Sequence, residues 1–219
     1  MKIAFYAPMK PPDHPVPSGD RAIAQGLVQA LLHRGHEVEI MSRMCTRYAW
    51  LKPLTLLRLS FERRKVLREA SRIDPDLWLT YHTYYKAPDL LGPMIHRRVG
   101  IPYYIVEGSH SHRRGKSPVT RPGFCWNMQA LLAASHVFAA KKRDLQGLRE
   151  IIPEERISYL PPGIDTAFFR RMPEEGEQLR RTLGISAAEQ VVFTAAMLRP
   201  GRKADGVRTV IDAMASLRL

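Results

Sequence analysis

The stretch with the densest set of chemically capable side chains is EGSHSHRRGKSPVTRPGF, residues 107–124. It begins with four groups that can hydrogen-bond or exchange protons and continues with three cations: Glu107, Ser109, His110, His112, Arg113, Arg114 and Lys116. Two histidines at i and i+2 beside a glutamate are compatible with a metal site, but no third ligand has a diagnostic spacing. We therefore assign no metal ligand here and interpret the stretch as an active-site loop. A solvated basic loop is the open alternative.

A second candidate is YHTYYK, residues 81–86, which combines aromatic rings with a histidine and a lysine. Aromatic rings with polar edges suit the apolar face of a sugar or the ring of an acceptor, so His82 and Tyr84 are candidate acceptor-side residues together with Glu107 and His112. A half-buried aromatic cluster beneath a helix is the competing interpretation.

Two further loops could hold an anion. PMKPPDHPVPSGD, residues 8–20, contains no G-x-G-x-x-G motif, but it places Gly19 before an expected helix, where free N–H groups favour a phosphate or a hydroxyl. MLRPGRKADG, residues 197–206, places Arg199, Arg202 and Lys203 before another helix. Cations repel one another and the positive end of a helix dipole, so this arrangement favours a bound phosphate. A plain turn and a plain charged loop are the respective alternatives.

Apolar runs and amphipathic stretches alternate along the chain, as expected for a parallel sheet wrapped by helices. Strands are predicted at residues 2–8, 36–42, 75–81, 101–108, 136–140 and 157–163. Helices are predicted at residues 21–35, 53–73, 87–100 (bent or broken at Gly92–Pro93), 125–135 and 142–152. The fold class is therefore α/β, a Rossmann-like doubly wound parallel sheet.

A charged stretch, residues 170–190, separates this alternation from one more apolar run, residues 191–198, and a last helix. We expect a first domain at 1–172, a linker at 173–190, and at 191–219 the first strand and helix of an incomplete second α/β domain. A strand and a helix alone cannot bury their apolar faces, so we expect this last segment to be the least stable one.

The composition narrows the compartment and the partners. The net charge of +13 favours anionic partners, although a basic surface without a partner is an equal alternative. The two cysteines, Cys45 and Cys125, are far apart and outside any CxxC pattern, which fits a reducing compartment. The N-terminus lacks a signal-like apolar region and no run is long enough to span a bilayer, so a cytoplasmic location is expected.

Three phrases in their order resemble glycosyltransferase family 4, the retaining sugar-nucleotide enzymes of GT-B fold. PSGDRAIAQGLVQALLHRGHEVEIMS resembles the family's opening, and ISYLPPGIDTAFF resembles its NG[VI]D…F phrase, with Pro162 in place of the usual Asn. LGISAAEQVVFTAAMLRPGRKADGVRTVIDAMASL is similar to the entry into the C-terminal domain. The family's donor-phosphate Arg falls on Met197, so Arg199 or Arg202 would substitute, while Lys203 matches the family Lys.

The resemblance implies a GT-B N-terminal domain and transfer of a sugar, with retention, from a nucleotide-sugar donor to a sugar, lipid or polysaccharide acceptor. It implies no cofactor and no metal. His110 would contact the transferred sugar as the catalytic residue, with His112 as the fallback. Gly19 would approach the donor phosphate through its N–H group, and Lys203 with a nearby Arg would stabilise the leaving diphosphate.

The family's E-x7-E element does not occur after residue 191, so the resemblance implies a partial chain, and we expect it to lack transferase activity by itself. The alternative function is a catalytically inactive α/β binding module at an anionic membrane surface. Residues 53–73 combine leucines and a phenylalanine with arginines, so peripheral attachment to the inner face of the membrane is considered. A nucleic-acid partner is not expected, because no nucleic-acid-binding signature is present.

Overall fold

The computed structural model describes residues 1–196, 198 and 200–217, and the chain divides into two compact units, Met1–Asp165 and Thr166–Leu219. The first unit is a six-stranded, fully parallel sheet in the order β2-β1-β3-β4-β5-β6. Its strands are β1 (Lys2–Tyr6), β2 (Glu37–Ser42), β3 (Leu77–Thr83), β4 (Tyr103–Gly108), β5 (His136–Ala139) and β6 (Ile157–Tyr159). The predicted α/β class is confirmed.

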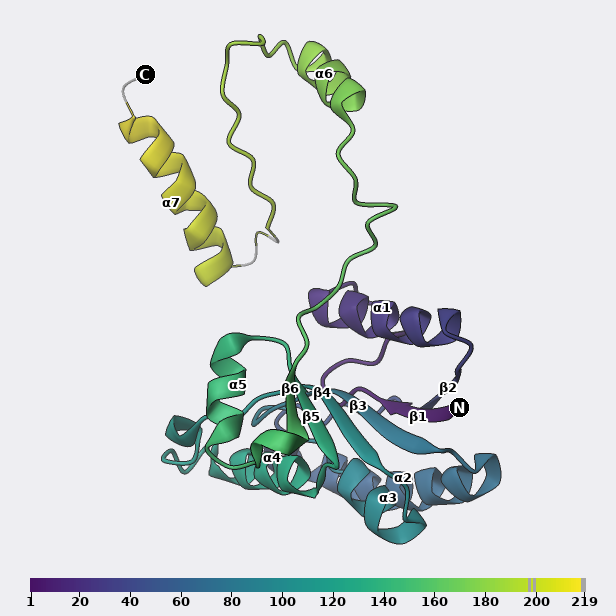
Figure 1. Ribbon diagram of the computed structural model, residues 1–219. Helices are drawn as coiled ribbons and strands as arrows, with labels where there is room; N and C mark the ends of the chain where they lie inside the picture. Colours follow the sequence, from purple (N-terminus) through teal and green to yellow (C-terminus); the bar gives the residue numbers. More distant parts are fainter. Residues whose placement is uncertain (197, 199, 218–219) are drawn as a thin grey trace. The chain divides into compact units, whose positions relative to one another are not determined.

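Helices cover both faces of this sheet (Figure 1). They are α1 (Gly19–His33), α2 (Pro53–Ile73), α3 (Gly92–Val99), α4 (Arg121–Ala133) and α5 (Lys142–Arg149), with short 3-10 turns η1 (Ala49–Leu51), η2 (His112–Arg114) and η3 (Glu154–Arg156). Helix α1 lies on one side of the sheet, and α2, α3 and α4 lie on the other. This arrangement explains why the strands are apolar on both faces.

The alternation of side chains along β1 divides the core in two. Ile3 and Phe5 belong to the cluster that includes Ala24 of α1, whereas Ala4 and Tyr6 belong to the cluster under α2, α3 and α4. Successive residues of a strand point to opposite faces, so one pentapeptide anchors both layers. Packing on both faces holds the sheet in place, and the sheet in turn positions the loops at the carboxyl ends of its strands.

Helix ends follow local chemistry. Ser18 caps α1 by accepting a hydrogen bond from the N–H of Arg21, and Gly35 after the helix has a φ of 76°. The predicted helix at residues 87–100 is shorter than expected and begins at Gly92. Asp89 accepts the N–H groups of Leu91 and Gly92, and this cap starts the helix at the position where Pro93 fits.

The second unit contains α6 (Pro173–Thr182) and α7 (Arg202–Ser216). Residues 191–196, expected as a strand, have no regular secondary structure. A strand requires a hydrogen-bonded neighbour, and the described part of this unit offers none, so this expectation is wrong for those residues. Residue 197 and Arg199 lie outside the described residues. The assignment of 191–219 to a second α/β domain remains a prediction.

Candidate functional site

The carboxyl ends of β3, β4 and β5 open onto a cavity of about 640 Å³. In open α/β sheets, ligands bind at this edge, near the point where the strand order reverses, which here lies between β1 and β3. The lining contains aromatic rings, histidines, carboxylates, cations and amide groups. The members used below are His82, Tyr84, Glu107, Ser109, His110, His112, Arg113, Arg114, Phe124, Asn127, Lys141, Arg143, Asp144, Gly147 and Glu150. Both predicted loops, after β3 and after β4, contribute to it.

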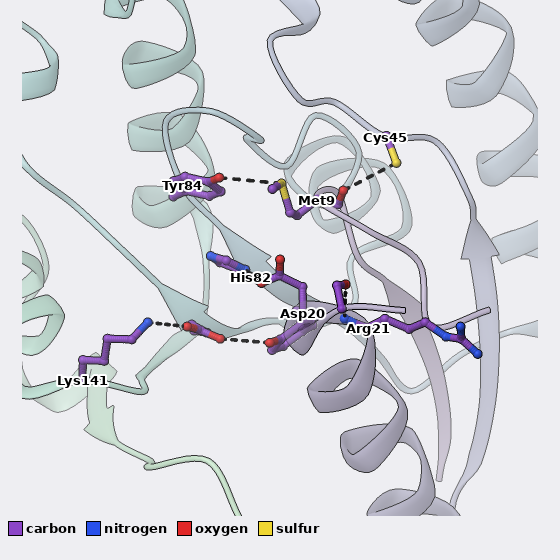
Figure 2. Close-up of polar contacts among 10 residues, drawn as sticks. Met9, Asp20, Arg21, Cys45, His82, Tyr84 and Lys141 are labelled. Atoms are coloured by element: carbon purple, nitrogen blue, oxygen red, sulfur yellow. Dashed lines mark hydrogen bonds and ion pairs between the residues drawn. The ribbon is translucent and has the colours of Figure 1, made fainter. Parts of the chain in front are cut away.

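His82, the penultimate residue of β3, pairs with Asp20 from the first turn of α1. The His82 Nδ1 lies 3.0 Å from the Asp20 Oδ1 (Figure 2). The hydrogen bond with His82 lowers the pKa of Asp20 below its usual value, partly opposed by burial of the carboxyl. With Nδ1 donating to a carboxylate, Nε2 is the basic nitrogen, and this is the arrangement that lets histidine exchange protons with a ligand.

The aromatic cluster predicted as an alternative is also present. The rings of His82 and Tyr84 stack with centroids 4.9 Å apart and planes 15° apart. The Tyr84 hydroxyl donates to the Met9 sulfur at 3.7 Å, and burial raises the pKa of Tyr84 to about 12 (Figure 2). Tyr84 therefore stays neutral at physiological pH and offers the cavity a ring and a hydroxyl group.

Glu107 is the penultimate residue of β4 and is buried. Its carboxylate accepts the Tyr81 hydroxyl at 3.0 Å and the Lys141 ammonium at 2.7 Å. The hydrogen bond with Glu107 raises the pKa of Lys141, and burial raises that of Tyr81. Lys141 keeps two thirds of its side chain exposed, so it neutralises the buried carboxylate and still faces the cavity.

His82 and Glu107 share a backbone peculiarity: their φ angles are 58° and 61°. Residues with a Cβ atom rarely adopt the left-handed region, and each such position costs free energy that surrounding contacts must offset. The two lie at corresponding places on adjacent strands, between the pairs Tyr81–Val106 and Thr83–Gly108. Both positions line the cavity, so part of the backbone strain of this unit lies at the edge of the candidate site.

His110, the residue chosen as catalytic, is buried against Phe124, with ring centroids 5.3 Å apart. Neither of its ring nitrogens has a hydrogen-bond partner among the described residues. Burial, and then the neighbouring His112, lower the pKa of His110, so the ring is neutral near pH 7. The His112 Nε2 pairs instead with the Glu150 Oε2 at 3.0 Å, a contact that the sequence did not indicate.

Four cations, Arg113, Arg114, Lys141 and Arg143, line the same cavity and make it suited to an anionic ligand. Arg114 lies over the Tyr85 ring at 4.7 Å from its centroid. Sequence reasoning identified the first two from their loop. It missed the other two, although both directly follow the fifth strand and that position was a signal.

The remaining predicted donor residues lie elsewhere. Gly19 is the first residue of α1, and a Cβ atom there would meet no atom within 4 Å in the described structure, so packing does not require a glycine. Arg202 and Lys203 begin α7 in the second unit, after Gly201 with its φ of 97°. Arg199 lies outside the described residues. Their donor roles remain predictions.

No protein-family model and no curated protein matches this chain. Among solved structures it is similar to MnaA of S. aureus in a structure with UDP, with 17% identity, a TM-score of 0.52, and coverage of 73% of this chain and 43% of that one. It is also similar to a Listeria monocytogenes protein assigned as a UDP-N-acetylglucosamine 2-epimerase, with 14% identity, a TM-score of 0.50, and coverage of 71% of this chain and 43% of that one. For UDP-GlcNAc 2-epimerase of Methanocaldococcus jannaschii the identity is 16% and the TM-score 0.49, with coverage of 74% of this chain and 46% of that one.

These similarities concern the fold. The first unit shares a Rossmann-like parallel α/β fold with MnaA and with the Listeria protein. The chain spans less than half of the length of the three proteins it was compared with. The resemblance to one particular family, glycosyltransferase family 4, is not established at these identities. No helix within the described residues is both long and apolar enough to cross a membrane.

Proposed function

We propose that this chain supplies the acceptor-side half of the site of an enzyme that acts on a nucleotide sugar, transferring its glycosyl group with retention. The observation that carries the proposal is the cavity at the carboxyl ends of β3, β4 and β5, lined by rings, proton-exchanging groups and cations. The fold shared with MnaA, which was solved with UDP, supports the nucleotide-sugar part. The resemblance to family 4 supports transfer with retention.

Each group has a role that its surroundings support. His110 is neutral and has unsatisfied ring nitrogens, so it can hydrogen-bond hydroxyls of the transferred sugar. His82, oriented by Asp20, is suited to accept the proton of the acceptor hydroxyl while the oxygen of that hydroxyl forms its bond to the sugar carbon. Lys141 balances Glu107 and adds positive charge to the cavity, which favours an anionic group of the ligand.

Arg202 and Lys203 belong to the proposal only through the resemblance. They would stabilise the leaving diphosphate, and the donor carbon would exchange its bond to that diphosphate for a bond to the acceptor oxygen. Clustered cations at the start of a helix suit this task. Gly19 would present its N–H group to the donor.

Binding can be tested by saturation-transfer NMR with UDP-GlcNAc and the purified chain. We expect transfer to the sugar protons, and a loss of it in His110→Ala and in His82→Ala. His33→Ala is the matched control, because His33 is exposed on α1 and outside the cavity lining. Equal transfer in all four proteins, or none in the wild type, would refute a sugar site in this cavity.

The contribution of positive charge in the cavity to ligand binding can be tested with two adjacent lysines. Lys141 lines the cavity, whereas Lys142 next to it is exposed and does not. Losing a hydrogen bond to a charged group costs about 1.5–3 kcal/mol, or roughly tenfold or more in affinity. We expect Lys141→Ala to weaken binding of UDP-GlcNAc by about tenfold and Lys142→Ala to leave it unchanged. Retention is tested with the whole enzyme to which this chain contributes its half of the site. The anomeric configuration of the product should equal that of the donor, and an inverted product would refute retention.

A second candidate function, docking at an anionic membrane, is favoured by one observation on α2. Leu54, Leu57 and Phe61 are 70%, 64% and 71% exposed, and their spacing of three and four residues places them on one face. The same face continues with Arg64 and Arg68, which are exposed. A helix that presents apolar residues and cations together can lie at the boundary between head groups and acyl chains.

Vesicle co-sedimentation tests this candidate. We expect binding to phosphatidylserine-containing vesicles, loss of binding in Leu57→Ser with Phe61→Ser, and weakening by salt as the Debye length falls. Arg63 is a poor choice for charge reversal, because its guanidinium donates to the Leu90 carbonyl. Arg64→Glu with Arg68→Glu is the informative pair. Equal binding to neutral vesicles, or no effect of that pair, would exclude electrostatic docking.

A further inference from the structure

Three side chains able to bind a metal converge at the end of the cavity where the loop after β4 meets the end of α5. His110, His112 and Glu150 each offer one ligand atom, and these atoms all lie within 4.8 Å of one another. We propose that this cluster binds a divalent transition-metal cation, with zinc as the best match. The two histidines are recognisable in the sequence, whereas the third ligand, Glu150, comes from a distant part of the chain and is brought to them by the fold.

His110 is the part of the cluster that indicates a ligand. Only 6% of the residue is exposed, and within the described structure both ring nitrogens lack a hydrogen-bond partner. Buried polar atoms are nearly always satisfied, so an unpartnered buried ring calls for a partner.

The donor set specifies the kind of cation. Two imidazole nitrogens and one carboxylate oxygen suit zinc and related first-row ions and suit calcium or magnesium poorly. Three protein ligands leave a fourth position for water or an oxygen of a bound molecule. All three residues line the cavity, so that open position faces the space where a ligand would lie.

The geometry needs only a small closure. Ligand atoms of a tetrahedral zinc site lie about 3.4 Å apart, since each is about 2.1 Å from the ion. The His112 Nε2 and the Glu150 Oε2 are already 3.0 Å apart, and their side chains are 63% and 52% exposed. Exposed side chains can rotate, so these two can move onto an ion held by the buried His110.

The backbone beneath the cluster is held in place. A Cβ atom on Gly147 would lie 2.5 Å from the His110 carbonyl oxygen, so glycine allows α5 to approach this loop closely, one turn before Glu150. The Ser109 hydroxyl donates to Asp144 of α5 at 2.8 Å. The Asn127 amide of α4 donates to the Ser109 carbonyl, also at 2.8 Å. A site built on such a fixed loop loses little entropy on binding an ion.

The arginines of the cavity bear on the charge of the complex. Arg113, Arg114 and Arg143 disfavour an isolated cation, while Glu150 neutralises one of the two charges of the ion. The remaining positive field favours an anion in the open position, such as hydroxide or a phosphate oxygen. The site therefore goes beyond the proposed function, which assigned no metal, without conflicting with a phosphorylated substrate in the same cavity.

The test uses the untagged full chain, freed of metal with a chelator, and Zn²⁺ alone as the probe. Isothermal titration should show one equivalent bound by the wild type and by the control His33→Ala. His112→Ala and Glu150→Gln should each weaken binding by at least about tenfold, since even indirect supports of a metal site contribute that much. Glu150→Gln keeps the size of an exposed side chain, so its fold is maintained, and thermal unfolding without metal checks both variants.

Co²⁺ gives a spectroscopic readout of the same ligands. We expect visible absorption bands on Co²⁺ addition to the wild type and their loss in both variants. Absence of Zn²⁺ binding in the wild type, or binding that is equal in the wild type, His112→Ala and Glu150→Gln, would overturn the proposal. The proposed function is tested separately with UDP-GlcNAc in the presence of EDTA, so the failure of one does not imply the failure of the other.

Discussion

Two glycines on different helices make a matched pair that tests how the loop of His110 is positioned. Gly147 lies in α5 and Gly26 in α1. Replacing a helical glycine by alanine gains up to about 1 kcal/mol from backbone propensity. At Gly26 a Cβ atom would meet nothing within 4 Å among the described residues, so that gain should appear in full.

At Gly147 the same Cβ atom would lie 2.5 Å from the His110 carbonyl oxygen, about 0.9 Å short of the 3.4 Å at which ordinary contact begins. The obstacle is backbone and cannot rotate away, so the helix or the loop must shift, at a cost of about 1–3 kcal/mol. We therefore expect Gly147→Ala to be less stable than Gly26→Ala by about 1–3 kcal/mol.

Urea unfolding followed by circular dichroism measures this difference as a shift of the midpoint at unchanged slope. A second readout is functional: Gly147→Ala should weaken Zn²⁺ binding, because the loop bearing His110 moves away from Glu150, whereas Gly26→Ala should leave it unaffected. Equal stability of the two variants would refute the close approach of α5 to the loop, and with it the argument that this loop is preorganised.

Three further predictions concern charge and order. Glu107 raises the pKa of Lys141 in the folded state, so the stability that Lys141→Met removes is present below about pH 10.4 and is lost as the pH rises above it. Urea midpoints of the wild type and the variant measure this, and a difference between them that persisted at higher pH would contradict the ion pair. The hydrogen bond with His82 lowers the pKa of Asp20, so Asp20→Asn should be less stable than the wild type above about pH 3.9. This stability difference should vanish as the pH falls below that value, and a difference independent of pH would contradict the pair with His82. Limited proteolysis should cut first between residues 183 and 196, which are irregular and bury no residue, and first cuts within β1 would contradict this.

The sheet was predictable because its signals are local. The apolar run of β1, the amphipathic α1 and the alternation of β2 each carry their own periodicity, and their order alone implies a parallel sheet. Residues 191–196 show the limit of the same reasoning. Their apolar run has strand propensity, but a strand forms only against a neighbour, and the sequence cannot show whether one is present.

The candidate site was predictable where its residues lie close together in the sequence, as in the loops after β3 and after β4. Glu107, His110 and His112 follow one strand and were identified together. Lys141 directly precedes α5 and Glu150 directly follows it. They reach the same cavity because β5 pairs beside β4, and no local sequence pattern expresses that strand order. The proposed metal site is an example. Its two histidines were recognised in the sequence but not assigned as ligands, because the third ligand, Glu150, is brought beside them by the strand order.

The left-handed backbone at His82 allows a prediction that separates strain from contact. His82 has a φ of 58°, a conformation that costs an alanine about 1–2 kcal/mol and a glycine almost nothing. Ala and Gly both remove the contacts with Asp20 and Tyr84, so the difference between His82→Gly and His82→Ala reports the backbone alone. We expect the glycine variant to be the more stable by about 1 kcal/mol.

The order should reverse at an ordinary strand position. Glu39 is exposed on β2 and is not among the residues with positive φ, so glycine there should be less stable than alanine by about 0.5–1 kcal/mol, because it loses more backbone freedom on folding. Urea unfolding of the four variants gives both differences. If glycine were the less stable residue at both positions, β3 would not be strained at its end. The contacts with Asp20 and Tyr84 would then have no strain to offset, and the case that this edge is built to hold His82 toward a ligand would fail.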